Sequence, residues 1–452
     1  MFVAQVRTFS RLAALVLLAV ACSCIGRECA AQFARNSAVG GVKVDVDGIL
    51  SQPEVGDFRQ LQAAWQAGMQ TVPADLQRPS ELRFVSLRSL EAEAAKALDA
   101  GQPVPDAVRY LAGLQRVRYV FVYPENKDIV IAGPAEGWKI NALGSVVGAS
   151  SGRPVLQLDD LLVALRVAES SNESGISCSI DQTPEGTQRL AQLGAPRAGM
   201  SPQMVARQQE QAAGNQKITV TGVPNTSHFA RVLVAADFRM KRLAMDFEKA
   251  PVADMPSYMD VLVSRRAASN FMAPRFWLAA NYEPIRRDEQ SLAWELRGQG
   301  IKCMTEEQNT STGSIQRTGK PDPIAQQWAD TFTAKFEELA REDSAFGELR
   351  NVMDLAVVAA LAAKERLFAK AGLEIPRLRN DIPVEEFHVP RAVPSQASFV
   401  RAGRGWVISV SGGVQIYPWQ VADRTEVAKE LATVRPARKD AAAQSWYFER
   451  TR

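Results

Sequence analysis

Residues 346–368, FGELRNVMDLAVVAALAAKERLF, decide the fold that we expect for this chain. The apolar residues recur at helical spacing and also fill most of the other faces, so little of such a helix is suited to water. Its uninterrupted apolar part, residues 355–363, is far shorter than the roughly 20 residues that span a bilayer. The stretch therefore predicts the buried central helix of a globular core, and we expect no transmembrane span in the mature chain.

One charged residue lies within this apolar run. Asp354 interrupts it, and Arg350 lies one turn earlier, within reach of the carboxylate. A first interpretation is a carboxylate that is paired or faces the edge of the core. A second is a buried acid with a raised pKa that lines a cleft, which makes Asp354 a candidate catalytic residue.

The rest of the chain mixes hairpins and helices without a repeating βαβ pattern. Residues 117–123 and 129–132 predict one β-hairpin, and residues 276–282 and 291–304 predict another. Residues 228–247 keep one apolar helical face over five turns, which predicts a helix despite the run VLVAA. We therefore expect an α+β fold in which antiparallel hairpins and several helices pack around residues 346–368.

Composition shifts suggest the domain boundaries. Residues 38–420 form the expected single domain, with a division into two α/β lobes, 38–193 and 217–420, as an option. Residues 194–216 are rich in Gln, Ala and Gly and predict a linker between such lobes. Residues 421–452 are charged and Ala-rich and predict a loosely attached tail.

Charge and residue supply exclude several common functions. The 452 residues include 53 Lys and Arg against 50 Asp and Glu, and this balance does not indicate nucleic-acid binding. The two histidines, His228 and His388, are a thin supply for metal or acid–base chemistry. The acids Asp159 and Asp160 suit the start of a helix. No spacing matches a zinc site or a phosphate-binding loop, so we expect no cofactor.

The N-terminus predicts export. Arg7 and Arg11 precede an apolar run at residues 12–24, and small residues flank a cleavage point after Ala31, as in a signal peptide of residues 1–31. Export would place the mature chain in the periplasm or outside the cell. A lipoprotein cut before Cys22 is an alternative, although the usual Leu three places before that cysteine is missing.

Two cysteines, Cys178 and Cys303, remain after such a cleavage. Each follows a Gly-Ile pair at the same spacing and lies in a predicted strand. A disulfide between neighbouring strands is one interpretation, because exported proteins form such bonds. Two separate buried thiols are the other.

Several blocks together resemble a known family. They are AVGGVKVDVDGIL, YLAGLQRVRYVFVYPENKDIVIAGPAEGW, GRPVLQLDDLLVALR, GISCSIDQTPEG, AADFRMKRLAM, LRNVMDLAVVAAL and SGGV, in this order between Ala38 and Tyr417. They resemble planctomycete secreted proteins that are known only as a domain of unknown function. The resemblance implies export and a single family domain, and it implies no catalytic residue.

The run Gly148-Ala149-Ser150-Ser151-Gly152 fits the pattern of a nucleophile elbow. That motif needs a strand before it and a helix immediately after it, whereas Arg153-Pro154 follows here. A flexible connection is therefore the first interpretation, and Ser150 as a nucleophile is the second.

Three function classes follow. The first is a non-catalytic structural or interaction module of the cell envelope, whose partner would be an envelope protein or polymer. The second is a hydrolase of an envelope or extracellular polymer that uses carboxylates or Ser150. The third is a small-ligand-binding protein with Trp138, Trp277 or Trp294 lining its pocket.

Overall fold

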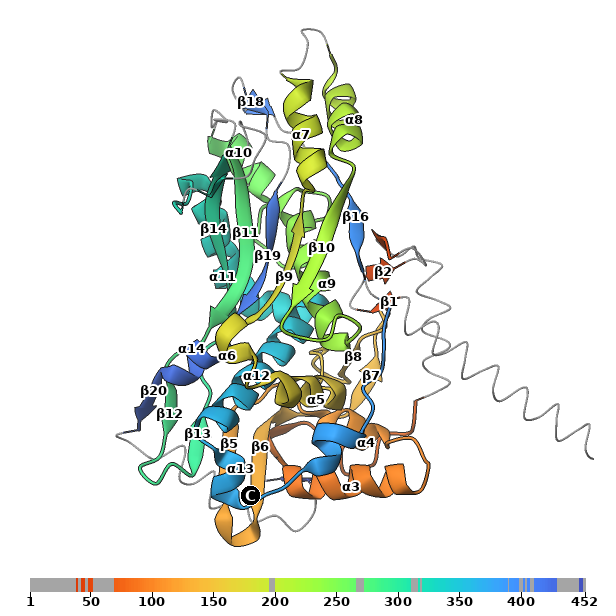
Figure 1. The fold of residues 1–452 in the computed structure, drawn as a ribbon, viewed down its shortest axis with the longest axis vertical. Coiled ribbons are helices and arrows are strands. Elements are labelled where there is room, and N and C mark those ends of the chain that lie inside the picture. The colour runs from red at the N-terminus through yellow and green to blue at the C-terminus, as the bar shows by residue number, and fades with distance from the viewer. Residues whose placement is uncertain are drawn as a thin grey trace, which may run out of the picture.

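The computed structural model describes most of the chain after the predicted signal peptide. The described residues are 38–39, 42–44, 48–51, 69–194, 200–265, 272–309, 316–317, 319–388, 390–397, 401–402, 405–406, 410–428 and 447–449. Residues 1–31, with Cys22, lie outside them. Two seven-stranded sheets lie in the two halves of the molecule along its longest axis, and helix α12 (Ser344–Lys364) lies between them (Figure 1).

The sheet at the top of Figure 1, called here the upper sheet, has the strand order β15-β14-β11-β19-β9-β10-β16. Neighbours are antiparallel except β11 and β19, which run parallel. Its strands are β9 Ile176–Asp181, β10 Asn215–Thr221, β11 Met272–Asn281, β14 Gly300–Asn309, β15 Gln316–Arg317, β16 Ala392–Pro394 and β19 Ser411–Ile416.

The lower sheet has the order β20-β12-β13-β5-β6-β4-β21, with β12 and β20 parallel. Its strands are β4 Ser80–Ser86, β5 Tyr119–Tyr123, β6 Asp128–Ala135, β12 Ile285–Arg287, β13 Ala293–Glu295, β20 Thr425–Val427 and β21 Tyr447–Glu449. The small sheets pair β1 Ala38–Val39, β2 Val42–Val44 and β3 Leu50–Ser51, then β7 Trp138–Ile140 with β8 Val146–Gly148, and β17 Arg401–Ala402 with β18 Gly405–Trp406.

The helices surround and join the two sheets. They are α3 Leu87–Asp99, α4 Asp106–Arg109, α5 Leu158–Val167, α6 Ser171–Ser174, α7 Pro184–Leu193, α8 Pro202–Ala213, α9 His228–Ala244, α10 Tyr258–Arg265, α11 Pro323–Glu342, α12 Ser344–Lys364, α13 Leu367–Ala371, a π-helix Arg377–Asp381 and α14 Pro418–Asp423. Within the described residues, none of them combines the length and the apolar character that a bilayer crossing requires.

The predicted central helix is α12, and the α+β class is confirmed. Every residue of α12 from Ser344 to Ala362 is buried, because α5, α9, α11 and α14 pack around it. The helix begins where the Asp343 side chain accepts a hydrogen bond from the backbone N–H of Ala345 at 3.1 Å. It ends before Arg366, whose left-handed φ of 50° separates α12 from α13.

Both predicted hairpins exist, and the second one joins the sheets. Strands β5 and β6 pair as expected around the turn 124–127. Strands β11 and β14 pair over ten positions in the upper sheet, while the segment between them continues as β12 and β13 into the lower sheet. Gly298 lies at the bend with φ of +100°, where a Cβ would come within 2.9 Å of the Asn281 carbonyl oxygen.

The sequential lobes do not describe this architecture. Each large sheet takes strands from both 38–193 and 217–420, since β9 lies in the upper sheet and β13, which pairs with β12, also pairs with β5 in the lower sheet. The predicted linker, 194–216, contains helix α8, which packs on α7. The predicted tail also supplies β20 and β21 to the lower sheet.

The predicted disulfide is contradicted by the strand order. Cys178 on β9 and Cys303 on β14 are both buried free thiols. They lie in one row of the upper sheet, with Leu278 and Val414 between them on two intervening strands. Three strand spacings amount to roughly 14 Å, about twice the Cα separation that a disulfide allows.

Candidate functional site

Asp354, on α12, is completely buried and bonds to residues just before β5 and just after β11, one segment from each hairpin. Its Oδ2 lies 3.2 Å from Nε of Arg116 and accepts a hydrogen bond from the backbone N–H of Val117 at 3.2 Å. Its Oδ1 accepts a hydrogen bond from the Tyr282 hydroxyl at 2.6 Å. The expected partner, Arg350, bonds to Glu337 instead, at 3.0 Å. Asp354 is therefore a paired core carboxylate that ties α12 to both hairpins.

Ser150 lies in a turn that a single carboxylate holds in place. Helix α5 begins only at Leu158, so the strand–turn–helix geometry of a nucleophile elbow is absent around Ser150. Glu136 Oε2 accepts the backbone N–H of Ser150 at 3.0 Å, and its Oε1 accepts the Ser151 N–H at 2.9 Å and the Ser151 hydroxyl. Burial raises the pKa of Glu136, but these hydrogen bonds outweigh burial and lower it.

His228, the first residue of α9, forms a buried pair with Asp160 of α5. The imidazole Nδ1 lies 3.0 Å from both carboxylate oxygens, and Nε2 lies 3.2 Å from the Gln157 amide. Burial lowers the pKa of His228, but the Asp160 carboxylate outweighs it and raises the pKa to about 9. At neutral pH the imidazole is therefore charged, so it can donate a proton but is a poor base.

The His228 member of this pair borders a small cavity of about 50 Å³. Glu348 of α12 also lines it, and burial raises the pKa of that carboxyl while the His228 charge opposes the effect. The Arg109–Glu385 ion pair, at 3.1 Å, lies at the same cavity. Such a volume holds a few water molecules and excludes an organic substrate.

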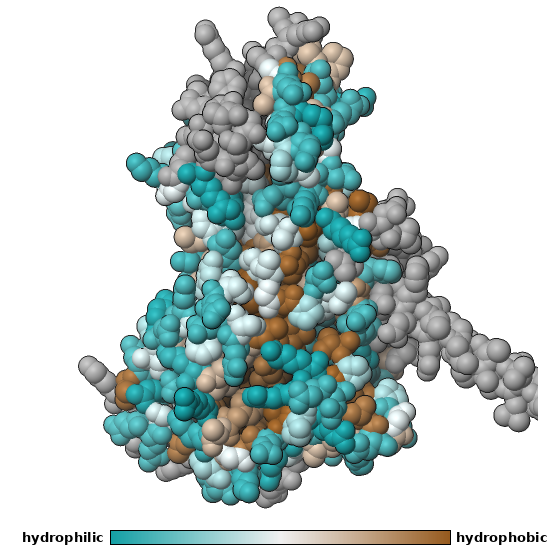
Figure 2. Space-filling view, viewed as in Figure 1, coloured by the Kyte–Doolittle hydropathy of each residue, from teal (hydrophilic) through white to brown (hydrophobic). Residues whose placement is uncertain are grey.

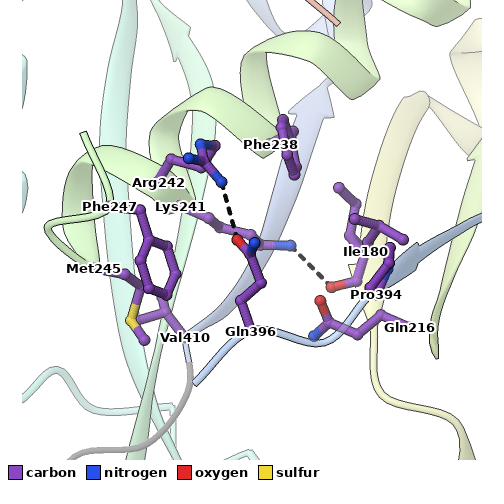
Figure 3. Close-up of a pocket in the computed structure, with 11 residues that line it drawn as sticks. Ile180, Gln216, Phe238, Lys241, Arg242, Met245, Phe247, Pro394, Gln396 and Val410 are labelled. Carbon is purple, nitrogen blue, oxygen red and sulfur yellow. Dashed lines mark hydrogen bonds between the residues drawn. The ribbon is translucent and has the colours of Figure 1, made fainter. Parts of the chain in front are cut away.

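A second small cavity, of about 40 Å³, lies between α9 and the β10–β16 edge of the upper sheet (Figure 3). Lys241 points across it and donates to the Ile180 carbonyl at 2.8 Å. Arg242 bonds to Gln396 at 2.9 Å and lies over the Phe247 ring. Lys241 and Arg242 thus already have hydrogen-bond partners within the protein, so the cavity offers a ligand few free donors.

The largest of these hollows is a groove of about 560 Å³ beside the C-terminal half of α12. Three small side chains of α12, Ala359, Ala362 and Ala363, lie at i, i+3 and i+4 and leave space that larger residues would fill. We call this hollow the alanine groove. Its other lining residues are Leu165, Arg166, Ala168 and Glu169 at the end of α5, Arg366, Phe368 and Ala369 at α13, and Arg379 and Asn380 on the π-helix.

Three arginines and one acid border the alanine groove. Arg166 donates to the carbonyl oxygens of Leu378 at 3.0 Å and Ile382 at 2.6 Å, which fixes the π-helix against α5. The Arg379 guanidinium lies 4.6 Å from the centre of the Phe368 ring. Among the described residues, none forms an ion pair with any of the three arginines.

The tryptophans proposed for a ligand pocket have other roles. Trp138 and Trp294 are buried core residues, and Trp138 packs edge-on against Tyr110. The Arg275 guanidinium lies 4.9 Å above the ring of Trp277. None of the three lines the alanine groove.

A family model described as "Protein of unknown function (DUF1598)" matches residues 178–258. No curated protein and no solved structure matches the chain. The matched segment runs from β9 into the start of α10, so it contains Cys178 and His228 but no residue of the alanine groove. The similarity is thus to a domain of unknown function, and it covers part of the range 38–417 over which the resemblance was expected.

Proposed function

We propose that this chain is an exported, non-catalytic binding module of the cell envelope, with the alanine groove as its recognition surface. The observation that supports a binding role is the volume of the groove, because about 560 Å³ lies within the range of small-ligand pockets. The signal-like residues 1–31 and the resemblance to planctomycete secreted proteins support export.

The contacts of the two candidate catalytic residues support a non-catalytic role. The carboxylate of Asp354 bonds to Arg116, Val117 and Tyr282, and the turn at Ser150 is fixed by Glu136. A hydrolase is the second candidate, favoured by the buried His228–Asp160 pair. That activity requires the cavity beside His228 to open beyond about 50 Å³ to admit a polymer.

Recognition is tested by crosslinking and affinity capture of the tagged full chain from its native envelope. Ala369→Trp fills the mouth of the groove, and Ala92→Trp places the same side chain at an exposed position of α3 as a matched control. We expect partners captured by the wild type and by Ala92→Trp to be lost with Ala369→Trp. Equal capture by all three proteins, or only abundant background proteins, would count against the proposal.

Export is tested separately by fractionation of the same cells. We expect the mature chain in the periplasm or the medium, shortened by residues 1–31. Incorporation of labelled palmitate that Cys22→Ser abolishes would identify the lipid-anchored alternative. Retention of the full-length chain in the cytoplasm would refute export.

A further inference from the structure

We infer that the alanine groove binds a small amphipathic anion, a molecule with an apolar chain and one carboxylate, sulfate or phosphate head group. The inference rests on the proposed function, since it names the ligand class of the same surface. It is carried by the combination of an apolar floor and an excess of positive charge at the rim.

The floor of the groove suits an apolar chain. Ala363 and Phe368 are half-buried and Ala369 is exposed, so their apolar side chains face the groove. Beneath them lie the buried apolar residues Leu165, Ala359 and Ala362. A polar ligand would lose its hydrogen bonds to water there without gaining others, whereas an alkyl chain would lose none. Figure 2 shows hydrophobic side chains gathered over the middle of this face, where α12 and α5 lie, with hydrophilic side chains beside them.

The rim supplies the charge. Arg166, Arg366 and Arg379 oppose the single carboxylate of Glu169, so the lining carries a net charge of +2 (three minus one). Arg366 and Arg379 are exposed, and neither makes an ion pair within the described part of the chain. A guanidinium group offers paired N–H donors that match the oxygens of a carboxylate or phosphate.

Local structure places two of these arginines beside the floor. The left-handed φ of 50° at Arg366 turns the chain sharply between α12 and α13. Arg379 is held over the Phe368 ring, which reduces the entropy that it loses on binding an anion. The same rim disfavours a cationic amphipath, because like charges repel.

The inference is tested by calorimetric titration of the full chain with decanoate and decyl phosphate below their micelle concentrations. Decanol and decyltrimethylammonium are the neutral and cationic controls. We expect one decanoate per chain, with decyltrimethylammonium at least about tenfold weaker. Octanoate should bind about fifteenfold more weakly than decanoate, since each buried methylene contributes about fourfold.

Variants locate the site. Arg366→Glu and Arg379→Glu should each weaken decanoate binding by about tenfold. Arg377→Glu is the matched charge reversal, because Arg377 lies outside the groove lining and is already paired with Asp99 and Asp381. Ala369→Trp should abolish binding, and Ala92→Trp should leave it unchanged.

The outcomes separate this inference from the proposed function. Equal affinities for decanoate and decyltrimethylammonium, or equal losses with Arg366→Glu and Arg377→Glu, would overturn the anion inference. An envelope partner lost only with Ala369→Trp would still support the recognition surface in that case. Charge-dependent decanoate binding without any envelope partner would support the anion site and refute the envelope role.

Discussion

Replacing Asp354 by alanine should destabilise the fold more than the loss of any one surface ion pair. The substitution leaves the Arg116 guanidinium without its carboxylate and leaves two further donors, the Tyr282 hydroxyl and the Val117 N–H, without an acceptor. Breaking a buried ion pair by removing one partner costs about 3–5 kcal/mol. Arg116 keeps its bond to the Gly298 carbonyl at 3.2 Å, which reduces the cost. We expect a loss of about 4 kcal/mol.

The assay is urea unfolding at pH 7, followed by tryptophan fluorescence and read as a shift of the midpoint at constant slope. A double-mutant cycle identifies the partner. Arg116→Met and Asp354→Ala should be coupled by about 2–3 kcal/mol, because the second substitution costs less once its partner is gone. The cycle of Arg350→Met with Asp354→Ala should show a smaller coupling, since Arg350 bonds to Glu337.

Two results would refute this reasoning. If Asp354→Ala lowered the free energy of unfolding by less than about 1 kcal/mol, the Arg116–Asp354 pair would contribute no more than a surface ion pair does. A larger coupling with Arg350 than with Arg116 would restore the partner that helical spacing predicts. Asp381→Ala is the control, because it removes an exposed i,i+4 pair with Arg377 and should cost less than about 1 kcal/mol.

Three further predictions concern titration and reactivity. The pKa of His228 is raised from its ordinary value of 6.5 to about 9 in the folded protein, so its pair with Asp160 stabilises the fold fully below pH 6.5 and loses that contribution as the pH rises through 9. Imidazole NMR with the His228 signal assigned checks this, and titration of His228 near pH 6.5 would contradict it. Glu136→Gln should cost about 2 kcal/mol at pH 7. The cost should shrink as the pH falls below 4.5, the ordinary pKa of a glutamate, because the lowered pKa of Glu136 makes its contribution fully present only above that value. Ser150→Ala should change stability by less than about 0.5 kcal/mol in the same unfolding assay. A larger cost for Ser150→Ala than for Glu136→Gln would contradict the role given to that carboxylate. In a chain that begins after residue 31, Cys178 and Cys303 should resist alkylation when folded and both react in guanidinium, because burial raises both thiol pKa values; a protein with no free thiol after unfolding would restore the disulfide.

Periodicity predicted the elements whose packing is decided within one helix or one turn. The apolar faces of α12 and α9 and the hairpin of β5 and β6 are of this kind, since their pattern lies in consecutive residues. The partner of Asp354 is different, because Arg116 lies 238 residues away and helical spacing offers only the nearby Arg350.

For a related reason, sequence patterns could not predict the order of the strands or the position of the surface hollows. The prediction that Cys178 and Cys303 lie in strands was correct, but nothing local says that two other strands separate them. Asp160 has the position of a helix-start acid, and only the fold brings His228 to it. The alanine groove combines residues 165–169 with residues 359–380, so its charge appears only after α5 packs on α12.

The position of β19 has a consequence for the order in which the protein can fold. This strand lies between β11 and β9 in the upper sheet, yet it comes from residues 411–416, near the end of the chain. Until those residues leave the ribosome, β11 with β14 and β9 with β10 can form only as separate pairs with open edges. The next segment then continues through α14 to β20, beside β12 in the lower sheet. The upper sheet therefore cannot close until residue 416 has been synthesised, and the lower sheet cannot gain its edge strand β20 until residue 427 has been. This delay exposes the nascent chain to aggregation and makes its folding slow.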